Sequence, residues 1–111
     1  MNAVGRALRL EPHPPAFFYW IEGFVFYCNR RYEDAVNTLR RPEVYGSGSR
    51  RILAAALAQS GDLDEARREG ALFRAMVPGF RISRWVALHA YGDAATLAHY
   101  AEGCRMAGLP E

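Results

Sequence analysis

A short pattern occurs twice in this 111-residue chain and limits the folds that the chain can adopt. Residues 31–39 and residues 62–67 each place a large apolar residue three positions before a small alanine, with acidic residues between the two. The alanines are Ala35 and Ala66, and a stretch with the apolar spacing of a helix precedes each copy. Repeated units of this kind bury their apolar faces only against one another, so the repetition predicts a stack of helices.

Apolar spacing and turn residues also predict where the helices lie. We expect helices at about residues 3–10, 16–28, 32–41, 50–60, 63–76, 81–91 and 94–107, and we find no strand-like alternation. Asp62 and Glu65 have the spacing of a capping box, and Gly61 can end the helix before them in the left-handed conformation. At the same turn of the first copy Arg30 stands in place of glycine, so we expect Asn29 to take the left-handed role there.

The two copies resemble the tetratricopeptide (TPR) repeat, whose pattern is W-x2-L-G-x2-Y, then A-x3-F, then P. The first copy supplies Tyr19, Gly23, Phe26, Ala35 and Leu39; the second supplies Leu53, Ala54, Leu57, Ala66 and Pro78; a preceding half copy supplies Ala7, Leu10 and Pro12. Close helix packing is expected at Tyr19, Gly23, Phe26, Ala35, Ala54, Leu57 and Ala66.

The resemblance implies an all-α fold: a short array of antiparallel helix pairs with a C-terminal capping helix. We expect one domain, divided into a half repeat at 1–15, repeats at 16–48 and 49–80, and a helix pair at 81–111. In that last pair Trp85 and Leu88 are expected to face inward. Asp93 is expected to cap the final helix, whose outer side, including His99, would face water.

The C-terminal stretch carries a second resemblance. Trp85, the tripeptide at 91–93 and the segment Arg105–Glu111 are similar to the end of TPR regions in bacterial class III adenylate/guanylate cyclase-type proteins. Related tails follow winged-helix transcriptional regulators. The resemblance implies that this chain is the C-terminal part of a larger bacterial signalling protein, which is either such a cyclase or such a regulator.

Few features of the chain indicate catalysis, metal binding or nucleic-acid binding. Fourteen basic and twelve acidic residues leave a net charge of +2, too small to indicate nucleic-acid binding by itself. His13, His89 and His99 are scattered, and no pattern of nucleophile, base and acid has a spacing that predicts catalysis. We therefore expect no enzymatic activity, no cofactor and no metal ion.

The most distinctive segment is the aromatic helix expected at residues 16–28. Its aromatic residues lie around nearly the whole circumference of the helix, so it needs cover on every side. Either the bent array and its C-terminal helix bury these rings, or the rings form a surface for a partner or for self-association. The expected partner-binding face consists of Phe17, Trp20, Phe24, Tyr27, Arg51, Trp85 and His89.

Together these features predict a non-catalytic module for protein–protein interaction or oligomerisation. Its partner is expected to be a protein or peptide, including a second copy of this chain, and not a nucleic acid, a membrane or a metal. No apolar run reaches the roughly 18 residues that a membrane span needs, and no secretory signal is recognised. Cys28 and Cys104 are expected to be free, buried thiols, which favours a cytoplasmic location.

Overall fold

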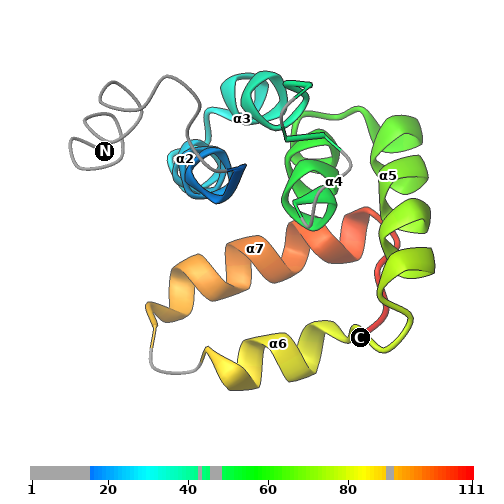
Figure 1. The fold of residues 1–111 in the computed structure, drawn as a ribbon. Coiled ribbons are helices and arrows are strands. Elements are labelled where there is room, and N and C mark those ends of the chain that lie inside the picture. Colours follow the sequence, from blue (N-terminus) through cyan, green and yellow to red (C-terminus); the bar gives the residue numbers. More distant parts are fainter. Residues whose placement is uncertain (1–15, 43, 46–48, 90–91) are drawn as a thin grey trace.

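The computed structural model describes residues 16–42, 44–45, 49–89 and 92–111, and within these residues all regular secondary structure is helical (Figure 1). The helices are α2 (Ala16–Cys28), α3 (Tyr32–Leu39), α4 (Arg50–Gln59), α5 (Leu63–Met76), α6 (Ile82–Leu88) and α7 (Ala94–Met106). The expected all-α fold is confirmed, and each of these helices overlaps an expected one. The helix expected at 3–10 lies outside the described residues.

The turns after α2 and α4 share one hydrogen-bonding pattern. Arg31 N–H donates to the Phe26 carbonyl at 2.9 Å, and 31 residues later Asp62 N–H donates to the Leu57 carbonyl at 3.0 Å. Gly61 has the expected left-handed φ of 98°, and at the first turn it is Arg30, with φ 61°, that adopts this conformation. The assignment to Asn29 was wrong, because the position of the closing bonds and not the residue type selects the left-handed residue.

Side-chain caps begin α5 and α7 as expected. The Asp62 carboxylate accepts a hydrogen bond from Glu65 N–H at 3.4 Å, and the Asp93 carboxylate accepts one from Thr96 N–H at 2.9 Å. The Thr96 hydroxyl also donates to Asp93, and these bonds hold the pKa of the Asp93 carboxyl below its usual range. The two caps satisfy backbone donors that a helix start leaves free.

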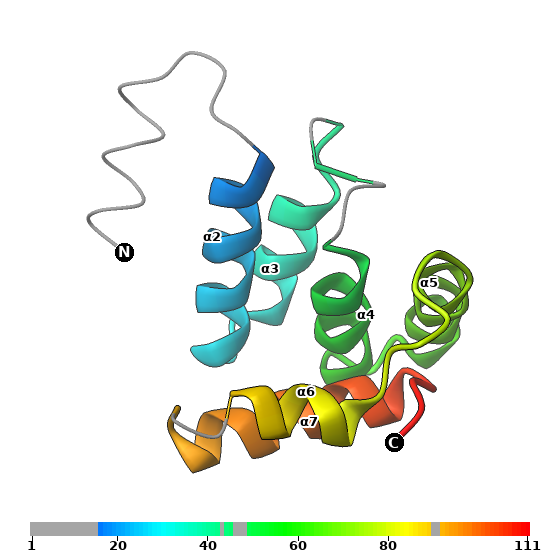
Figure 2. The same cartoon turned by 60° about the horizontal axis from the view of Figure 1, so that its bottom comes forward.

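The helices pack in pairs along the chain, α2 with α3 and α4 with α5, and α3 also packs on α4. The third pair departs from this order. Helix α7, and not α6, packs against α4, α5 and α2. It crosses beneath α2 and α4 on the side away from α3, and α6 lies along α7 (Figures 1 and 2). The far side of α6 is left to solvent, so Leu88 is 69% exposed and does not face inward as expected.

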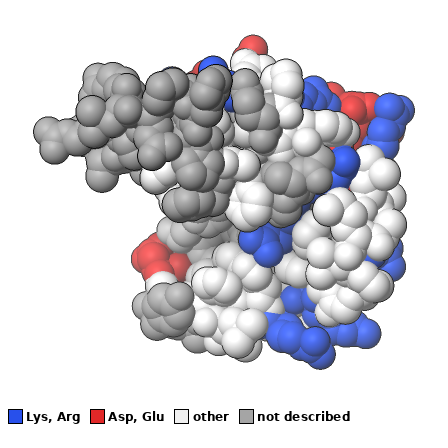
Figure 3. Space-filling view, in the orientation of Figure 1, with Lys and Arg blue, Asp and Glu red and all other residues white. Residues whose placement is uncertain are grey.

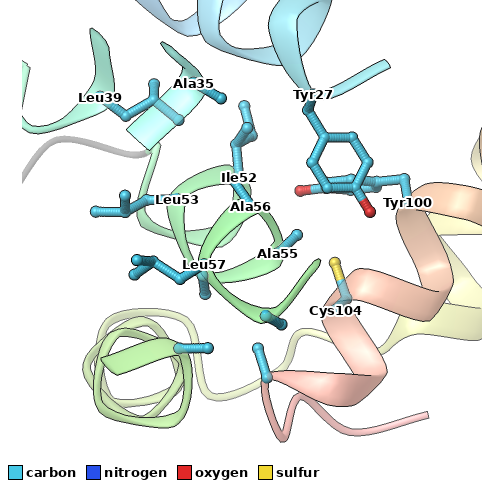
Figure 4. Packing of buried hydrophobic residues seen from close by; sticks show 14 of the residues in the cluster. Tyr27, Ala35, Leu39, Ile52, Leu53, Ala55, Ala56, Leu57, Tyr100 and Cys104 are labelled. Atoms are coloured by element: carbon cyan, nitrogen blue, oxygen red, sulfur yellow. The ribbon is translucent and has the colours of Figure 1, made fainter. Parts of the chain in front are cut away.

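The core surrounds α4, whose residues from Ile52 to Ala58 are all buried. Four of these are alanines with no exposed surface, and their small side chains let α3, α5 and α7 approach α4 closely (Figure 4). Cys104 of α7 is buried in this core as expected, whereas Cys28 is only half-buried; both are free thiols.

The last residues of the chain supply hydrogen-bond acceptors to the first N–H groups of α6. The carbonyl oxygens of Pro110 and Glu111 each accept a hydrogen bond at 2.8 Å, from the N–H groups of Ile82 and Ser83 respectively. Gly108, with φ 85°, makes the turn that brings them back. No helix of the described residues combines the length and the apolar character that crossing a bilayer requires.

Candidate functional site

A groove with a volume of about 420 Å³ lies where α2, α4, α6 and the start of α7 meet. Its walls are almost entirely apolar, and both tryptophans of the chain line it. We call it the Trp groove; its principal residues are Trp20, Ile21, Phe24, Arg51, Trp85, His89, Asp93 and Leu97. This volume falls within the range of pockets that hold small molecules or single side chains of a partner.

The structure brings together most of the expected partner-binding face. Trp20 and Phe24 come from α2, Arg51 from α4, Trp85 from α6, and His89 from the residue that ends α6. These residues are far apart in the sequence, and they meet because α6 and α7 fold back across the first two helix pairs. The side chain of Phe17 lies outside the described part of the structure.

Tyr27 does not belong to this face, and its assignment as a partner-binding residue is corrected. Its side chain has no exposed surface, because α7 covers this end of α2. Its ring stacks on His99 with 4.4 Å between centroids, and its hydroxyl donates to the His99 carbonyl at 2.6 Å. The same contact places the His99 ring against α2, so His99 is half-buried and does not lie on the water-facing side as expected. Burial raises the pKa of the Tyr27 hydroxyl well above its ordinary value.

Arg51 is held among aromatic rings at the inner end of the groove. Its guanidinium lies 5.6 Å from the Trp85 ring, 5.7 Å from the Tyr100 ring and 5.8 Å from the Phe80 ring, distances at which cations interact favourably with aromatic faces. Its Nε–H donates to the Tyr100 hydroxyl at 2.6 Å. This bond restrains the plane of the guanidinium. Among the described residues no hydrogen bond or ion pair engages its Nη atoms, so their N–H groups can donate to a ligand.

Tyr100 is the residue that sequence reasoning missed. It is 1% exposed, and its ring meets Phe24 at 5.3 Å, Trp85 at 4.8 Å and Tyr27 at 5.6 Å between centroids. From its position on α7, Tyr100 thus contacts residues of α2, α4 and α6. Burial raises the pKa of its hydroxyl well above the ordinary value. A large aromatic residue in the middle of the last helix could have indicated a buried contact there. Its place between α2, α4 and α6 follows only from the way α7 crosses them.

Trp85 and His89 form one wall of the groove as a stacked pair. Their rings lie 4.2 Å apart at an angle of 23°, and His89 Nδ1 lies 2.8 Å from the Trp85 carbonyl oxygen. Both residues sit on one face of α6 because they are four positions apart. The pair lines the groove together with Trp20 and Phe24 of α2.

The residues expected at helix packing contacts lie in or against the core. A Cβ atom at Gly23 would come within 2.7 Å of Leu39, so α2 and α3 approach too closely for a side chain there. Ala35, Ala54 and Ala66 have no exposed surface, and Leu57 is 3% exposed. Tyr19 is also buried, and Phe26 is half-buried beneath the Arg31 guanidinium, 4.8 Å from its ring centroid.

Within the described residues, no three His, Cys, Asp or Glu side chains come together as metal ligands would. Comparison of the chain with protein-family models, curated proteins and solved structures finds no match. The described residues form an all-α fold with an apolar groove between α2, α4, α6 and the start of α7, and the TPR and cyclase resemblances remain predictions.

Proposed function

We propose that this chain is a non-catalytic protein-interaction module that binds a large apolar side chain of a partner protein in the Trp groove. The observation that carries the proposal is the meeting of Trp20, Phe24 and Trp85 around an open, almost wholly apolar hollow. Apolar hollows with aromatic walls are typical places for the central side chain of a protein–protein interface.

The wider proposal is that this module belongs to a larger bacterial signalling protein of the cytoplasm. Its support is the resemblance of residues 105–111 to the ends of TPR regions in cyclase-type proteins and transcriptional regulators. The coding sequence upstream of this chain in its genome tests the proposal. A nucleotide-cyclase or winged-helix domain in the same reading frame would support it, and an unrelated gene or a different domain there would contradict it.

A peptide-display selection tests the groove. A random peptide library is selected against the wild-type chain, against Leu97→Arg in the groove wall, and against Leu72→Arg on the exposed side of α5 as a matched control. We expect wild type and Leu72→Arg to enrich the same large apolar residue at a defined position. Leu97→Arg should weaken binding roughly tenfold, a change of about 1.4 kcal/mol in binding free energy.

Thermal melts establish that both variants are folded before the peptides are compared. Intrinsic fluorescence then reports binding directly, because the only two tryptophans of the chain line the groove. Enrichment of no common residue, or equal binding to Leu97→Arg, would contradict the proposal. Concentration-dependent self-association that Leu97→Arg abolishes would identify the partner as a second copy of this chain.

A further inference from the structure

We infer that the partner segment accepted by the Trp groove carries a carboxylate side chain beside its large apolar side chain, and that Arg51 binds this carboxylate. The inference rests on the proposed function and adds the chemistry of the partner. It predicts a segment in which Asp or Glu lies next to an aromatic or large aliphatic residue.

The first observation is that Arg51, unlike its neighbour Arg50 and unlike Arg40, is not paired with a carboxylate of the described residues. Arg50 is paired with Glu69 at 2.9 Å and Arg40 with Glu65 at 3.1 Å. Arg51 lines the groove, is only partly exposed, and has no carboxylate within ion-pair distance among the described residues. A cation held against apolar walls without a counter-charge is unfavourable, and cation–π contacts offset only part of this.

The second observation is that Arg51 is already oriented for a carboxylate. The bond from its Nε–H to Tyr100 is 2.6 Å long, and Tyr100 is fixed by the rings of Phe24, Tyr27 and Trp85. The two Nη atoms then form the planar fork that matches the two oxygens of a carboxylate. Because the fork is held before binding, less side-chain freedom is lost when a ligand arrives.

The third observation is the charge around the groove. Arg81 and Arg84 are exposed at the start of α6, beside Trp85, and Figure 3 shows basic side chains at the lower right of this view and acidic ones at its left edge. Asp93 is an acidic residue of the groove wall, and its carboxylate is engaged by the Thr96 N–H and hydroxyl groups. The exposed arginines at the start of α6 favour the approach of an acidic side chain, whereas Asp93 disfavours a long acidic run.

Two small probes isolate the role of the carboxylate. 4-Phenylbutyrate joins an aromatic ring to a carboxylate, and 4-phenylbutanamide has nearly the same shape without the charge. We expect the acid to bind the wild-type chain roughly tenfold more tightly than the amide in a tryptophan-fluorescence titration. Arg51→Met should remove this preference, whereas Arg67→Met, which changes an exposed arginine of α5 that does not line the groove, should retain it.

Arg51→Lys and Tyr100→Phe keep the test decisive if Arg51→Met fails to fold. The lysine retains the charge without the fork, and the phenylalanine retains Arg51 without the bond that orients it, so each should reduce the preference for the acid. The peptide selection gives an independent result. Peptides that bind the wild-type chain should pair Asp or Glu with the apolar residue, and peptides selected on the folded Arg51 variant should lack the acidic residue.

The outcomes separate this inference from the proposed function. Equal binding of acid and amide, or an acid preference that survives Arg51→Met, overturns the inference, while apolar peptides that still bind leave the proposed function standing. Binding of neither probe and enrichment of no peptide overturns both. Tight binding of 4-phenylbutyrate without any peptide enrichment overturns the assignment to a protein partner and identifies a small carboxylate as the occupant.

Discussion

At the scale of single residues, small side chains decide how closely the helices approach. Ala66 has no exposed surface and lies where α5 meets α4, whereas Ala71 on the same helix is exposed. A leucine at position 66 would have to displace the close-packed neighbours of α4. The same leucine at position 71 would extend into solvent.

We therefore expect Ala66→Leu to lower the free energy of unfolding by roughly 1–3 kcal/mol. Ala71→Leu is the control and should change it by less than about 0.5 kcal/mol. Urea denaturation of the two variants and the wild-type chain measures the difference. A stable Ala66→Leu variant would mean that the contact between α4 and α5 is looser than the structure has it.

His99 makes the stability of the fold depend on pH. Desolvation lowers the pKa of its imidazole, and the positive charge of Arg30 lowers it further by a smaller amount. The negative charge of Glu102 opposes both effects. The His99 ring stacks on Tyr27, and its Nε2 atom lies 2.7 Å from the Tyr32 hydroxyl oxygen. Because the unfolded chain binds the proton more readily, stability should fall as the pH drops below the ordinary histidine value of about 6.5.

Urea midpoints of the wild-type chain and His99→Gln, at about pH 7.5 and about pH 5.5, measure this effect. The glutamine variant should be less stable at the higher pH, since it loses the stacking on Tyr27, yet it should lose less on acidification. All other ionisable side chains are the same in the two proteins and so do not affect the comparison. An equal loss on acidification in the two proteins would show that His99 has the same affinity for protons in the folded and unfolded chains.

Burial makes the thiol of Cys104 unreactive. Desolvation raises its pKa to about 12, and that of the half-buried Cys28 thiol is also raised. Since the thiolate is the reacting form, Cys104 in a Cys28→Ala variant should react with Ellman's reagent on the order of 100-fold or more slowly in the native chain than in urea. Similar rates in the two conditions would indicate that α7 separates from the core frequently.

At the scale of the elements, the contact of α7 with α2 and α4 depends on one glycine. A Cβ atom at Gly103 would collide with the Tyr27 hydroxyl and press against Ala55, from which α7 cannot withdraw without exposing Tyr100. Gly79, in the turn after α5, has open space around it and no left-handed backbone requirement. The two glycines are therefore a matched pair for the same substitution.

Gly103→Ala should destabilise the chain by roughly 1–3 kcal/mol, although alanine by itself favours a helix. Gly79→Ala should leave the stability within about 0.5 kcal/mol of wild type. Thermal or urea melts distinguish the two, and tryptophan emission at low denaturant reports whether the Trp groove opens. A Gly103→Ala chain as stable as Gly79→Ala would contradict the close contact between α7 and α4.

The extent of the helices was predictable because it depends on local features. Asp62 and Asp93 act on N–H groups three residues away, and Gly61 closes a turn within its own neighbourhood. One error was itself local: Arg30 takes the left-handed conformation that we assigned to its neighbour, because the turn closes with the bond from Arg31 N–H to the Phe26 carbonyl. The other arose where a distant contact decides, since His99 packs on Tyr27 although it is polar.

At the scale of the whole molecule, α7 and the residues after it close the structure. They cover Tyr27 and Ala55, and they supply the carbonyls that accept hydrogen bonds from the start of α6. Ending the chain after Tyr91 would remove Tyr100 and expose the inner side of α2 and α4. Repeat arrays without a terminal cap of this kind lose solubility.

We expect the truncated chain to aggregate or to melt at least about 10 °C below the full chain. Size-exclusion chromatography with light scattering and thermal melts at several concentrations test this. The Gly103→Ala chain provides the comparison in which α7 is present but packs less closely against α2 and α4. A truncated chain that remains soluble, monodisperse and equally stable would show that α2–α5 form a complete core without α7.

The all-α class, the positions of the helices and the small residues at their contacts follow from local sequence patterns, because caps, turns and apolar spacing act over a few residues. The sequence also identified Trp20, Phe24, Arg51, Trp85 and His89 as one face. The crossing of α7 over α2 and α4 is visible only in the folded chain; it buries Tyr27 and makes Tyr100 the residue that orients Arg51. That crossing depends on the close contact between Gly103 and Ala55, which are 48 residues apart in the sequence. A pattern of neighbouring residues cannot predict a contact at that separation.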